Sequence, residues 1–344
     1  MTVRENVNLK FYTTFGIGGD AKFFVVAING SDVSEALTMA REKNLPVFIL
    51  GGGSNILVSD EGFPGVVIKN EILGFEIHGR EVEIGAGEIW DTSLARCLEN
   101  DLQGIECLSG IPGTVGGAVV QNIGAYGQTL ARVVELVEVI DLDTLETKVF
   151  KKDECEFEYR NSIFKKNPGK YCVTKLTLKL NYGGIPDITY PSVAKRFEGT
   201  ARPPITEVRQ AVIDIRAEKG MVILPGYEVL KSAGSYFKNP IVTKKKFEEI
   251  LHMISCPDPW HWAEGPDIKV SAACLITQAG FSKGQMIGKA QISPFQPLAI
   301  INPDGATAED IKFTANHIRH RVLDKFGIEL TEEIVYIDTI NASN

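Results

Sequence analysis

The stretch SGIPGTVGGAVVQNIGAYG, residues 109–127, limits the folds open to this chain because it holds six glycines among 19 residues and no charged side chain. A loop exposed to water would be more polar. Glycine has no Cβ, so it lets the backbone approach a neighbouring molecule closely and adopt turns that other residues avoid. The stretch therefore predicts a backbone surface that lies against a flat or charged ligand. Glycines that serve the fold alone are the alternative.

Two further loops of the same kind lie earlier in the chain. LGGGSNIL, residues 50–57, follows the apolar run VFIL, and IGAGEIW occupies residues 84–90. The backbone N–H groups of such loops suit phosphate oxygens. The loop at 50–57 matches neither the G-x-G-x-x-G pattern, since Ile56 replaces the last glycine, nor a P-loop, since no lysine follows. Together the three loops predict an extended dinucleotide that is bound across two domains.

Charge limits the classes of partner. The chain has 344 residues, enough for a large core and for two or three domains. Its 36 basic and 44 acidic residues give a net charge of -8, whereas the surface of a general nucleic-acid binder is basic. We therefore expect no nucleic-acid partner. An anionic small molecule needs a local cluster of basic groups.

Targeting and redox signals favour the cytoplasm. The N-terminal segment lacks the apolar core of a signal peptide, and no apolar run approaches the roughly 20 residues of a membrane-spanning helix, so we expect no membrane partner. The six cysteines are scattered without a C-x-x-C pair, which favours reduced thiols. His317 and His320 share a helix face, but no carboxylate or cysteine stands at ligand spacing, so we expect no metal site.

Hydrophobic periodicity predicts an α+β chain. The first helix is expected to begin after Asp32 as its cap. Helical spacing marks the segments near 33–43, 92–100, 206–219, 247–254, 271–280 and 307–326. Strands are expected at 47–50, 65–70, 175–180 and 328–337, and hairpins at 75–87 and 133–150.

Several motifs occur in one order along nearly the whole chain. They are TTFGIGG at 13–19, LGGGSNIL, GAGEIW, IPGTVGGAVVQNIGAYG, CEFEYRNSIFK at 155–165, GSYFKNP at 234–240 and IELTEEIV at 328–335. In this order and spacing the chain resembles the UDP-N-acetylenolpyruvoylglucosamine reductase family, in the longer form that carries a substrate-gripping tyrosine. No single loop is that specific, but the combination is.

The resemblance implies a fold and an activity. The fold would be α+β, with two FAD-binding domains of the vanillyl-alcohol-oxidase type and a C-terminal α+β substrate-binding domain. Residues 1–70 with 326–344 would form the first part of the FAD-binding unit, 71–219 the second, and 220–325 the substrate-binding domain. The activity would be reduction of UDP-N-acetylglucosamine enolpyruvate to UDP-N-acetylmuramate for peptidoglycan synthesis, by a monomer in the bacterial cytoplasm, with non-covalent FAD and with NADPH as reductant.

The resemblance also assigns the site residues. Cofactor contacts would be Gly51, Gly52, Gly53, Ser54, Asn55, Gly113, Thr114, Val115, Gln121, Asn122, Gly124 and Arg216. Catalytic residues would be Arg160, Ser235 and Glu333, and substrate contacts Tyr190, Lys219, Asn239 and Gln296.

The expected chemistry gives each catalytic group a task. The flavin N5 would pass hydride to the terminal carbon of the enol ether, and negative charge would spread from the adjacent carbon into its carboxylate. Such charge needs preorganised positive partners, and the guanidinium fork of Arg160 suits a carboxylate. Ser235 would protonate the carbon. A protonated glutamate would donate a hydrogen bond to the same oxygens, and burial raises a carboxyl pKa in that direction.

The chain departs from the common family pattern in two places. Many members read Leu-Glu-Pro-Glu where this chain has Leu330, Thr331, Glu332 and Glu333. Alternation along a strand sends the two glutamates to opposite faces, so a slip of one residue would exchange them. The SPF before Gln296 is also unlike common members.

Other functions stay open on sequence alone. Arg160 is also compatible with a surface salt bridge, Ser235 with a turn, and Tyr190 beside Pro191 with packing. Alternative functions are another FAD-dependent oxidase or dehydrogenase of a sugar or alcohol, and a nucleotide-binding regulatory module without chemistry. A serine hydrolase is the weakest alternative, because no histidine lies in a motif near Ser235.

Overall fold

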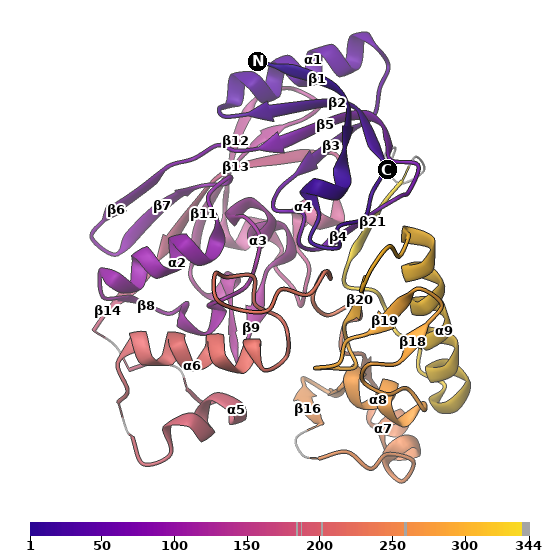
Figure 1. The fold of residues 1–344 in the computed structure, drawn as a ribbon. Helices are drawn as coiled ribbons and strands as arrows, with labels where there is room; N and C mark the ends of the chain where they lie inside the picture. The colour runs from indigo at the N-terminus through magenta and orange to yellow at the C-terminus, as the bar shows by residue number, and fades with distance from the viewer. Residues whose placement is uncertain (184, 187, 201, 258–259, 339–344) are drawn as a thin grey trace.

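The computed structural model describes residues 1–183, 185–186, 188–200, 202–257 and 260–338. The first half of the chain forms two sheets with their helices, and the orange and yellow C-terminal part lies beside them (Figure 1). Within the described ranges, no helix is both long and apolar enough to cross a membrane.

The first sheet has four strands in the order β1-β2-β5-β3. These are β1 (Val3–Asn8), β2 (Asp20–Ala27), β5 (Phe63–Asn70) and β3 (Val47–Leu50). Strand β5 lies parallel to both β2 and β3, and its near-continuous apolar sequence matches burial on two faces. Helix α1 (Gly30–Glu42) packs on β2 and β5 through the stripe of apolar residues that the sequence predicts.

Helix α1 begins earlier than the sequence indicates. Asn29 is its N-cap, and its side-chain oxygen accepts a hydrogen bond from the Asp32 amide at 3.0 Å. The expectation that Asp32 caps this helix is wrong. The Asp32 carboxylate instead accepts from the Ile28 amide, so it closes the turn that precedes the helix.

The second sheet has five antiparallel strands in the order β12-β11-β13-β7-β6. These are β12 (Thr147–Lys151), β11 (Val134–Asp141), β13 (Tyr171–Lys179), β7 (Glu81–Gly85) and β6 (Phe75–His78). Both predicted hairpins are present, as β6–β7 and β11–β12. Helices α2 (Trp90–Glu99) and α3 (Val115–Gln121) join the core on one face of this sheet, where Trp90 and Val115 are fully buried.

The remaining elements lie between the strands of these sheets in the sequence or follow them toward the C-terminus. The helices are α4 (Ile163–Lys166), α5 (Pro191–Ala194), α6 (Ile205–Ala217), α7 (Lys244–Leu251), α8 (Ala272–Gln278) and α9 (Ala308–Phe326). Short strand pairs are β8 (Leu102–Gln103) with β14 (Asn181–Tyr182) and β9 (Gly124–Ala125) with β10 (Gln128–Thr129). Two three-stranded sheets combine β15 (Ile241–Val242), β17 (Asp267–Val270) and β16 (His261–Glu264), and β18 (Met286–Ile287), β19 (Ala290–Ile292) and β20 (Ile300–Ile301).

The long helix α9 is the main support of the C-terminal core. Thr307 caps it in a capping box with Asp310, and Gly327 ends it in the left-handed conformation, which matches the helical segment predicted near 307–326. Its apolar face packs against α8, β19 and β20.

The expected final strand at 328–337 is mostly irregular. Only β21 (Val335–Ile337) is a strand, and it pairs in parallel with β4 (Ile56–Val58), directly after the loop at 50–55. The preceding residues bond to other segments: the Glu333 amide donates to the Tyr236 carbonyl at 2.8 Å. This return brings residues 330–337 beside the first part of the chain. The domain boundaries stay predictions, and residues 339–344 of the segment 326–344 lie outside the described residues.

One disulfide corrects the expectation of six reduced thiols. Cys256, after α7, is bonded to Cys274 on α8, with 6.2 Å between the two Cα atoms. The spacing of 18 residues gives no motif, so only the fold brings the two thiols together. The other four cysteines are buried and form no disulfide within the described ranges.

Candidate active site

A cavity of about 420 Å³ is lined by segments that are far apart in the sequence. Its walls come from the loop after β3, the glycine-rich stretch with α3, the segment around Arg160, the residues near 216–223, the segment 230–235, and the residues before β21. Its volume lies in the range of sites for small molecules and cofactors.

The glycine loops form this cavity because they pack against each other at backbone distance. A Cβ on Gly52 would lie 2.6 Å from the Gly113 Cα, and one on Gly51 would lie 2.7 Å from the Thr114 Oγ1. Gly53 has φ +65, and a Cβ there would lie 1.8 Å from the Tyr12 carbonyl oxygen. Gly51 and Gly52 are therefore required by the contact between the two loops, and Gly53 by the close approach of Tyr12.

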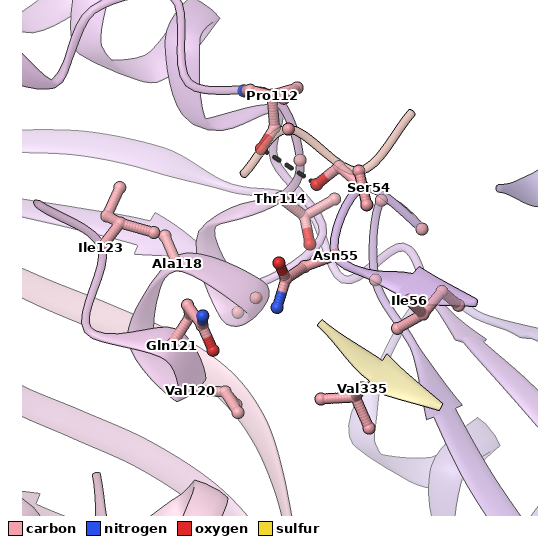
Figure 2. A pocket seen from close by; sticks show the side chains of 18 of the residues that line it. Ser54, Asn55, Ile56, Pro112, Thr114, Ala118, Val120, Gln121, Ile123 and Val335 are labelled. Atoms are coloured by element: carbon pink, nitrogen blue, oxygen red, sulfur yellow. Dashed lines mark hydrogen bonds between the residues drawn. The ribbon is translucent and has the colours of Figure 1, made fainter. Parts of the chain in front are cut away.

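Polar groups around these loops are arranged for a ligand. Ser54 donates to the Pro112 carbonyl at 3.1 Å and joins the two loops (Figure 2). The Thr114 hydroxyl is buried and makes no hydrogen bond to any described residue. Lys69, which sequence reasoning missed, donates to the Gly51 carbonyl at 2.7 Å, and burial lowers the pKa of its ammonium. A buried hydroxyl without a partner is a sign of an absent polar ligand.

Helix α3 places its residues on two sides. Gln121 points into the cavity, near Asn55 and Val335 (Figure 2). Val115 is fully buried in the core instead. Asn122 ends the helix in the left-handed conformation, and its side chain donates to the Glu158 carbonyl and accepts from the Ala131 amide. Val115 and Asn122 therefore support the wall of the cavity without lining it.

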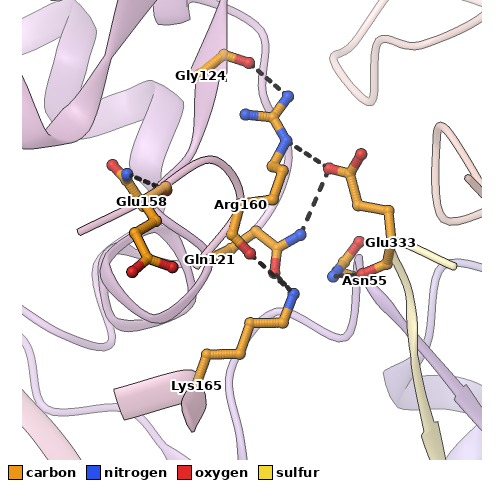
Figure 3. Close-up of polar contacts among 8 residues, drawn as sticks. Asn55, Gln121, Gly124, Glu158, Arg160, Lys165 and Glu333 are labelled. Atoms are coloured by element: carbon orange, nitrogen blue, oxygen red, sulfur yellow. Dashed lines mark hydrogen bonds and ion pairs between the residues drawn. The ribbon is translucent and has the colours of Figure 1, made fainter. Parts of the chain in front are cut away.

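The three predicted catalytic residues converge on the cavity. Arg160 Nε donates to Glu333 Oε1 at 2.6 Å, and Arg160 Nη2 donates to the Gly124 carbonyl at 2.7 Å (Figure 3). Gln121 Nε2 lies 3.4 Å from the same Glu333 oxygen. Ser235 also lines the cavity, and its hydroxyl makes no hydrogen bond to the residues that the structure describes. The predicted catalytic groups thus share one cavity across 173 residues of sequence between Arg160 and Glu333.

The two neighbouring glutamates point to different places. Glu333 lines the cavity, and its backbone carbonyl accepts from Asn55 Nδ2 at 3.2 Å. Glu332 lies on the other side, where burial raises the pKa of its carboxyl while Arg319 and Lys312 act to lower it. The structure therefore selects Glu333 as the glutamate that lines the cavity, and its catalytic role stays a prediction.

Lys165 is a further residue of this cluster that sequence reasoning missed. Its ammonium donates to Gln121 Oε1, and it lies 3.3 Å from the Arg160 carbonyl oxygen (Figure 3). Burial lowers its pKa to about 8, with a smaller contribution from Lys238. The signal was present in the motif CEFEYRNSIFK, of which Lys165 is the last residue.

A group of aromatic and basic side chains adjoins the cavity at Arg216. The Arg216 guanidinium is buried, donates to the Gly110 carbonyl at 3.1 Å, and has its pKa lowered by burial. Its charge also acts on Tyr126, whose pKa burial raises to about 12. Lys219 lies 5.3 Å from the centre of the Tyr126 ring, and Tyr190 packs edge-on against it at 5.5 Å. Two of the predicted substrate contacts thus meet around one tyrosine.

The other two predicted substrate contacts lie apart from this group. Asn239 lines a separate pocket with Tyr159 and Lys238, and its side-chain oxygen accepts from the Ala272 amide at 3.0 Å. The amide nitrogen of Gln296 is buried without a hydrogen bond to a described residue. None of the four predicted substrate contacts lines the main cavity in this structure.

The charges of the cavity oppose the charge of the chain. Among the described residues that line it, three are basic (Arg160, Lys165 and Arg216) and one is acidic (Glu333). A cleft of one sign within a chain of net charge -8 concentrates ions of the opposite sign. The site therefore suits an anionic ligand. It provides the local cluster of basic groups that an acidic chain needs in order to bind such a ligand.

Comparisons with known proteins support the predicted fold class. A family model described as an FAD binding domain matches residues 21–145, and the C-terminal domain model of UDP-N-acetylenolpyruvoylglucosamine reductase matches residues 226–337. Both bear out the predicted fold class. The described residues thus combine the FAD-binding part with a distinct C-terminal domain.

Relatives match over nearly the whole chain. A UDP-N-acetylenolpyruvoylglucosamine reductase of Streptomyces avermitilis is 37% identical over 336 residues, covering 94% of this chain and 92% of that protein. One of Pseudomonas aeruginosa is 35% identical over 345 residues, covering 97% and 98%. The crystal structure of the Thermus caldophilus enzyme is 28% identical, with a TM-score of 0.68 over 98% of this chain and 100% of that one. The chain belongs to the UDP-N-acetylenolpyruvoylglucosamine reductase family.

Proposed function

We propose that this protein reduces UDP-N-acetylglucosamine enolpyruvate to UDP-N-acetylmuramate, with FAD as cofactor and NADPH as reductant. Family membership supports the reaction class, which makes the protein an FAD-dependent oxidoreductase of peptidoglycan precursor synthesis. The observation that carries the proposal is the meeting of Arg160, Ser235 and Glu333 in one basic cavity beside the glycine loops.

The residues present fit a dinucleotide. The backbone at Gly51, Gly52 and Gly113 packs so closely that a Cβ at any of these glycines would overlap a neighbouring residue, and the buried Thr114 hydroxyl beside them needs a partner. These groups would hold the pyrophosphate, while Gln121, Gly124 and Arg216 would contact the flavin. When bound, FAD supplies the hydride that it has received from NADPH. FAD can fill this role without a covalent bond to the protein.

Arg160 and Glu333 would hold the reacting end of the substrate. Arg160 uses Nε and Nη2 within the chain, whereas Nη1 makes no hydrogen bond to a described residue and is left for the substrate carboxylate. Glu333 Oε2 is likewise without such a partner. A fixed guanidinium stabilises the charge that develops in the carboxylate during reduction, because it is oriented before the reaction begins.

Ser235 would complete the reaction by protonating the substrate carbon next to the carboxylate. Ser235 lines the cavity, and its hydroxyl is not engaged with any described residue. The bond from carbon to hydrogen forms as the Ser235 O–H bond breaks, and the alkoxide regains a proton from water. A positioned acid of this kind contributes about 10²- to 10⁴-fold to a rate.

The sugar nucleotide would extend toward the aromatic group beside Arg216. Lys219 and Tyr190 offer an ammonium and a phenol to its diphosphate, and Asn239 and Gln296 offer amides to the sugar. Because the three catalytic residues come from one chain, we propose a monomer that works in the cytoplasm, where nucleotide substrates are found. Neither a nucleic acid nor a membrane is required.

The test combines a spectrum with kinetics. The purified protein is expected to be yellow, to release its flavin on denaturation, and to oxidise NADPH rapidly only when the enolpyruvyl sugar is present. A protein that stays colourless after FAD is added, or that turns over sugars with oxygen but ignores the enolpyruvyl substrate, contradicts the proposal. Size-exclusion chromatography with light scattering tests the monomer.

A further inference from the structure

We propose that Lys165 is a positioning residue for the reduction: its ammonium fixes the Gln121 amide in the orientation that donates to Glu333. The inference rests on the proposed function of the same site. Lys165 does not touch the reacting atoms in this scheme. It acts through Gln121, which lies between Lys165 and Glu333 (Figure 3).

Hydrogen bonds at its main chain and at its ammonium hold Lys165 in place. Ser162 caps α4 by accepting from the Lys165 amide at 3.2 Å, and its hydroxyl donates to the Val120 carbonyl at 2.7 Å. Helix α4 is thereby tied to the end of α3, where Gln121 lies. The Lys165 ammonium is also 3.3 Å from the carbonyl oxygen of Arg160, a residue with φ 54. A non-glycine residue in this conformation persists only where its surroundings hold it.

The hydrogen-bond chemistry allows one orientation of the Gln121 amide. A lysine ammonium only donates hydrogen bonds, whereas a carboxylate only accepts them. The amide oxygen must therefore face Lys165 and the amide nitrogen must face Glu333. With Arg160 Nε on the same oxygen, Glu333 Oε1 receives two donors and the carboxylate is held between them.

This arrangement depends on the proton of Lys165. The charged groups that face Lys165 are Lys238 and Arg160, which lower its pKa, and Glu333, which raises it; burial is the largest cause, and the resulting pKa is about 8. A neutral amine can accept a hydrogen bond, so deprotonation removes the reason for the amide to keep its orientation. The Gln121 bond to Glu333 then weakens as the pH rises through about 8.

The first experiment compares Lys165→Met with Lys166→Met in the flavin-loaded enzyme. Lys166 is the adjacent lysine, but it pairs with Glu156 and Glu158 away from the cavity. We expect Lys165→Met to slow reoxidation of the reduced flavin by the enolpyruvyl sugar about 10- to 100-fold, because small misplacements of catalytic groups have effects of that order. In Lys165→Met, the rate of flavin reduction by NADPH should stay within about twofold of the wild type. In Lys166→Met, the rates of both half-reactions should stay within about twofold of the wild type.

The second experiment uses pH. In the wild type, the rate of the substrate half-reaction should fall as the pH rises through about 8. In Lys165→Arg the decrease should move to higher pH, since a guanidinium stays protonated. Selective labelling of glutamine side chains gives a readout independent of activity: the Gln121 amide resonances, assigned by their loss in Gln121→Leu, should shift with a midpoint near 8 in the wild type and stay constant in Lys165→Arg.

A double-mutant cycle tests the route of the effect. If Lys165 acts through Gln121, Lys165→Met should have little further effect in a Gln121→Leu background. Full additivity, or a wild-type pH profile in both Lys165 variants, overturns the inference. If Lys165→Met does not fold, the pH profile and amide signals of Lys165→Arg decide alone. A wild-type protein that does not reduce the enolpyruvyl sugar refutes the proposed function instead, and the amide titration still tests the contact.

Discussion

Ser235 is the residue whose removal should separate the two halves of the reaction. Its hydroxyl lines the cavity and holds no described part of the fold together. In Ser235→Ala we expect NADPH to reduce the flavin at a rate within about threefold of the wild type. Protonation of the substrate carbon should slow by about 10²- to 10⁴-fold, the usual contribution of a positioned acid. Stopped-flow absorbance of the flavin follows both halves.

The control for this variant is Ser282→Ala, which removes an exposed hydroxyl far along the chain in the loop after α8. It should leave both half-reactions unchanged. Equal slowing of both halves in Ser235→Ala, or loss of flavin from it, would assign Ser235 a structural role.

At single positions, sequence reasoning found the groups with distinctive chemistry and missed those that act through a neighbour. Arg160, Ser235 and Glu333 were named from motifs, and all three line the cavity. The motif CEFEYRNSIFK contains Lys165, but neither Lys165 nor Lys69 is predicted as a site residue, because a lysine in a sequence does not show what it faces in the fold. Their roles depend on burial and on donors that converge only in the folded chain.

Gly53 tests the close contact of the loop at 50–55 with Tyr12. A Cβ at this position would overlap the Tyr12 carbonyl at 1.8 Å, and φ is +65. We expect Gly53→Ala to displace the loop at 50–55, to lower the melting temperature and to weaken FAD binding at least tenfold. Differential scanning fluorimetry and titration of the apoprotein with FAD measure the two effects.

Gly79→Ala is the matched control for that change. Gly79 has φ +64, but a Cβ there would meet nothing within 4 Å. It should cost only the conformational penalty of about 1–2 kcal/mol for a left-handed residue with a side chain, and FAD affinity should be unchanged. If Gly53→Ala and Gly79→Ala change the melting temperature and the FAD affinity equally, the close contact at Gly53 is not the reason for the glycine there.

Elements with strong periodicity were predicted well, and the segment at 328–337 was not. The hairpins and helices follow from alternation and helical spacing of their own residues. In the last segment Leu330 and Ile334 are buried as a strand pattern suggests, yet only Val335–Ile337 has a partner strand. Alternating burial indicates contact with a core, whereas a strand also needs a neighbour for its hydrogen bonds, and the sequence does not show which segment that is.

At the scale of the whole molecule, we expect loss of the disulfide to affect the stability of the fold but not the binding of FAD. Cys256 and Cys274 lie 18 residues apart, both in the C-terminal part, whereas the glycine loops lie in the first 127 residues. We expect Cys256→Ser to lower the free energy of unfolding by about 3 kcal/mol, the value for a loop of this size. FAD affinity should stay within about twofold.

Alkylation under denaturing conditions without reductant provides the direct check. Mass spectrometry should find four modified cysteines, namely Cys97, Cys107, Cys155 and Cys172. Six modified cysteines would restore the expectation of reduced thiols. A loss of flavin in Cys256→Ser would mean that the C-terminal part also supports the cofactor loops.

The order of synthesis has a consequence for the pairing of β4 with β21. The Asn55 side chain and the Glu333 carbonyl that it binds are 278 residues apart. A ribosome therefore makes the short strand Ile56–Val58 long before its partner Val335–Ile337 exists. Until then the nascent chain carries an open strand edge next to the loop at 50–55, and an open edge invites pairing with other chains. Early capture of the dinucleotide by the loop at 50–55 would cover that region during translation, so flavin supply in the cell should affect how much of this protein is recovered folded.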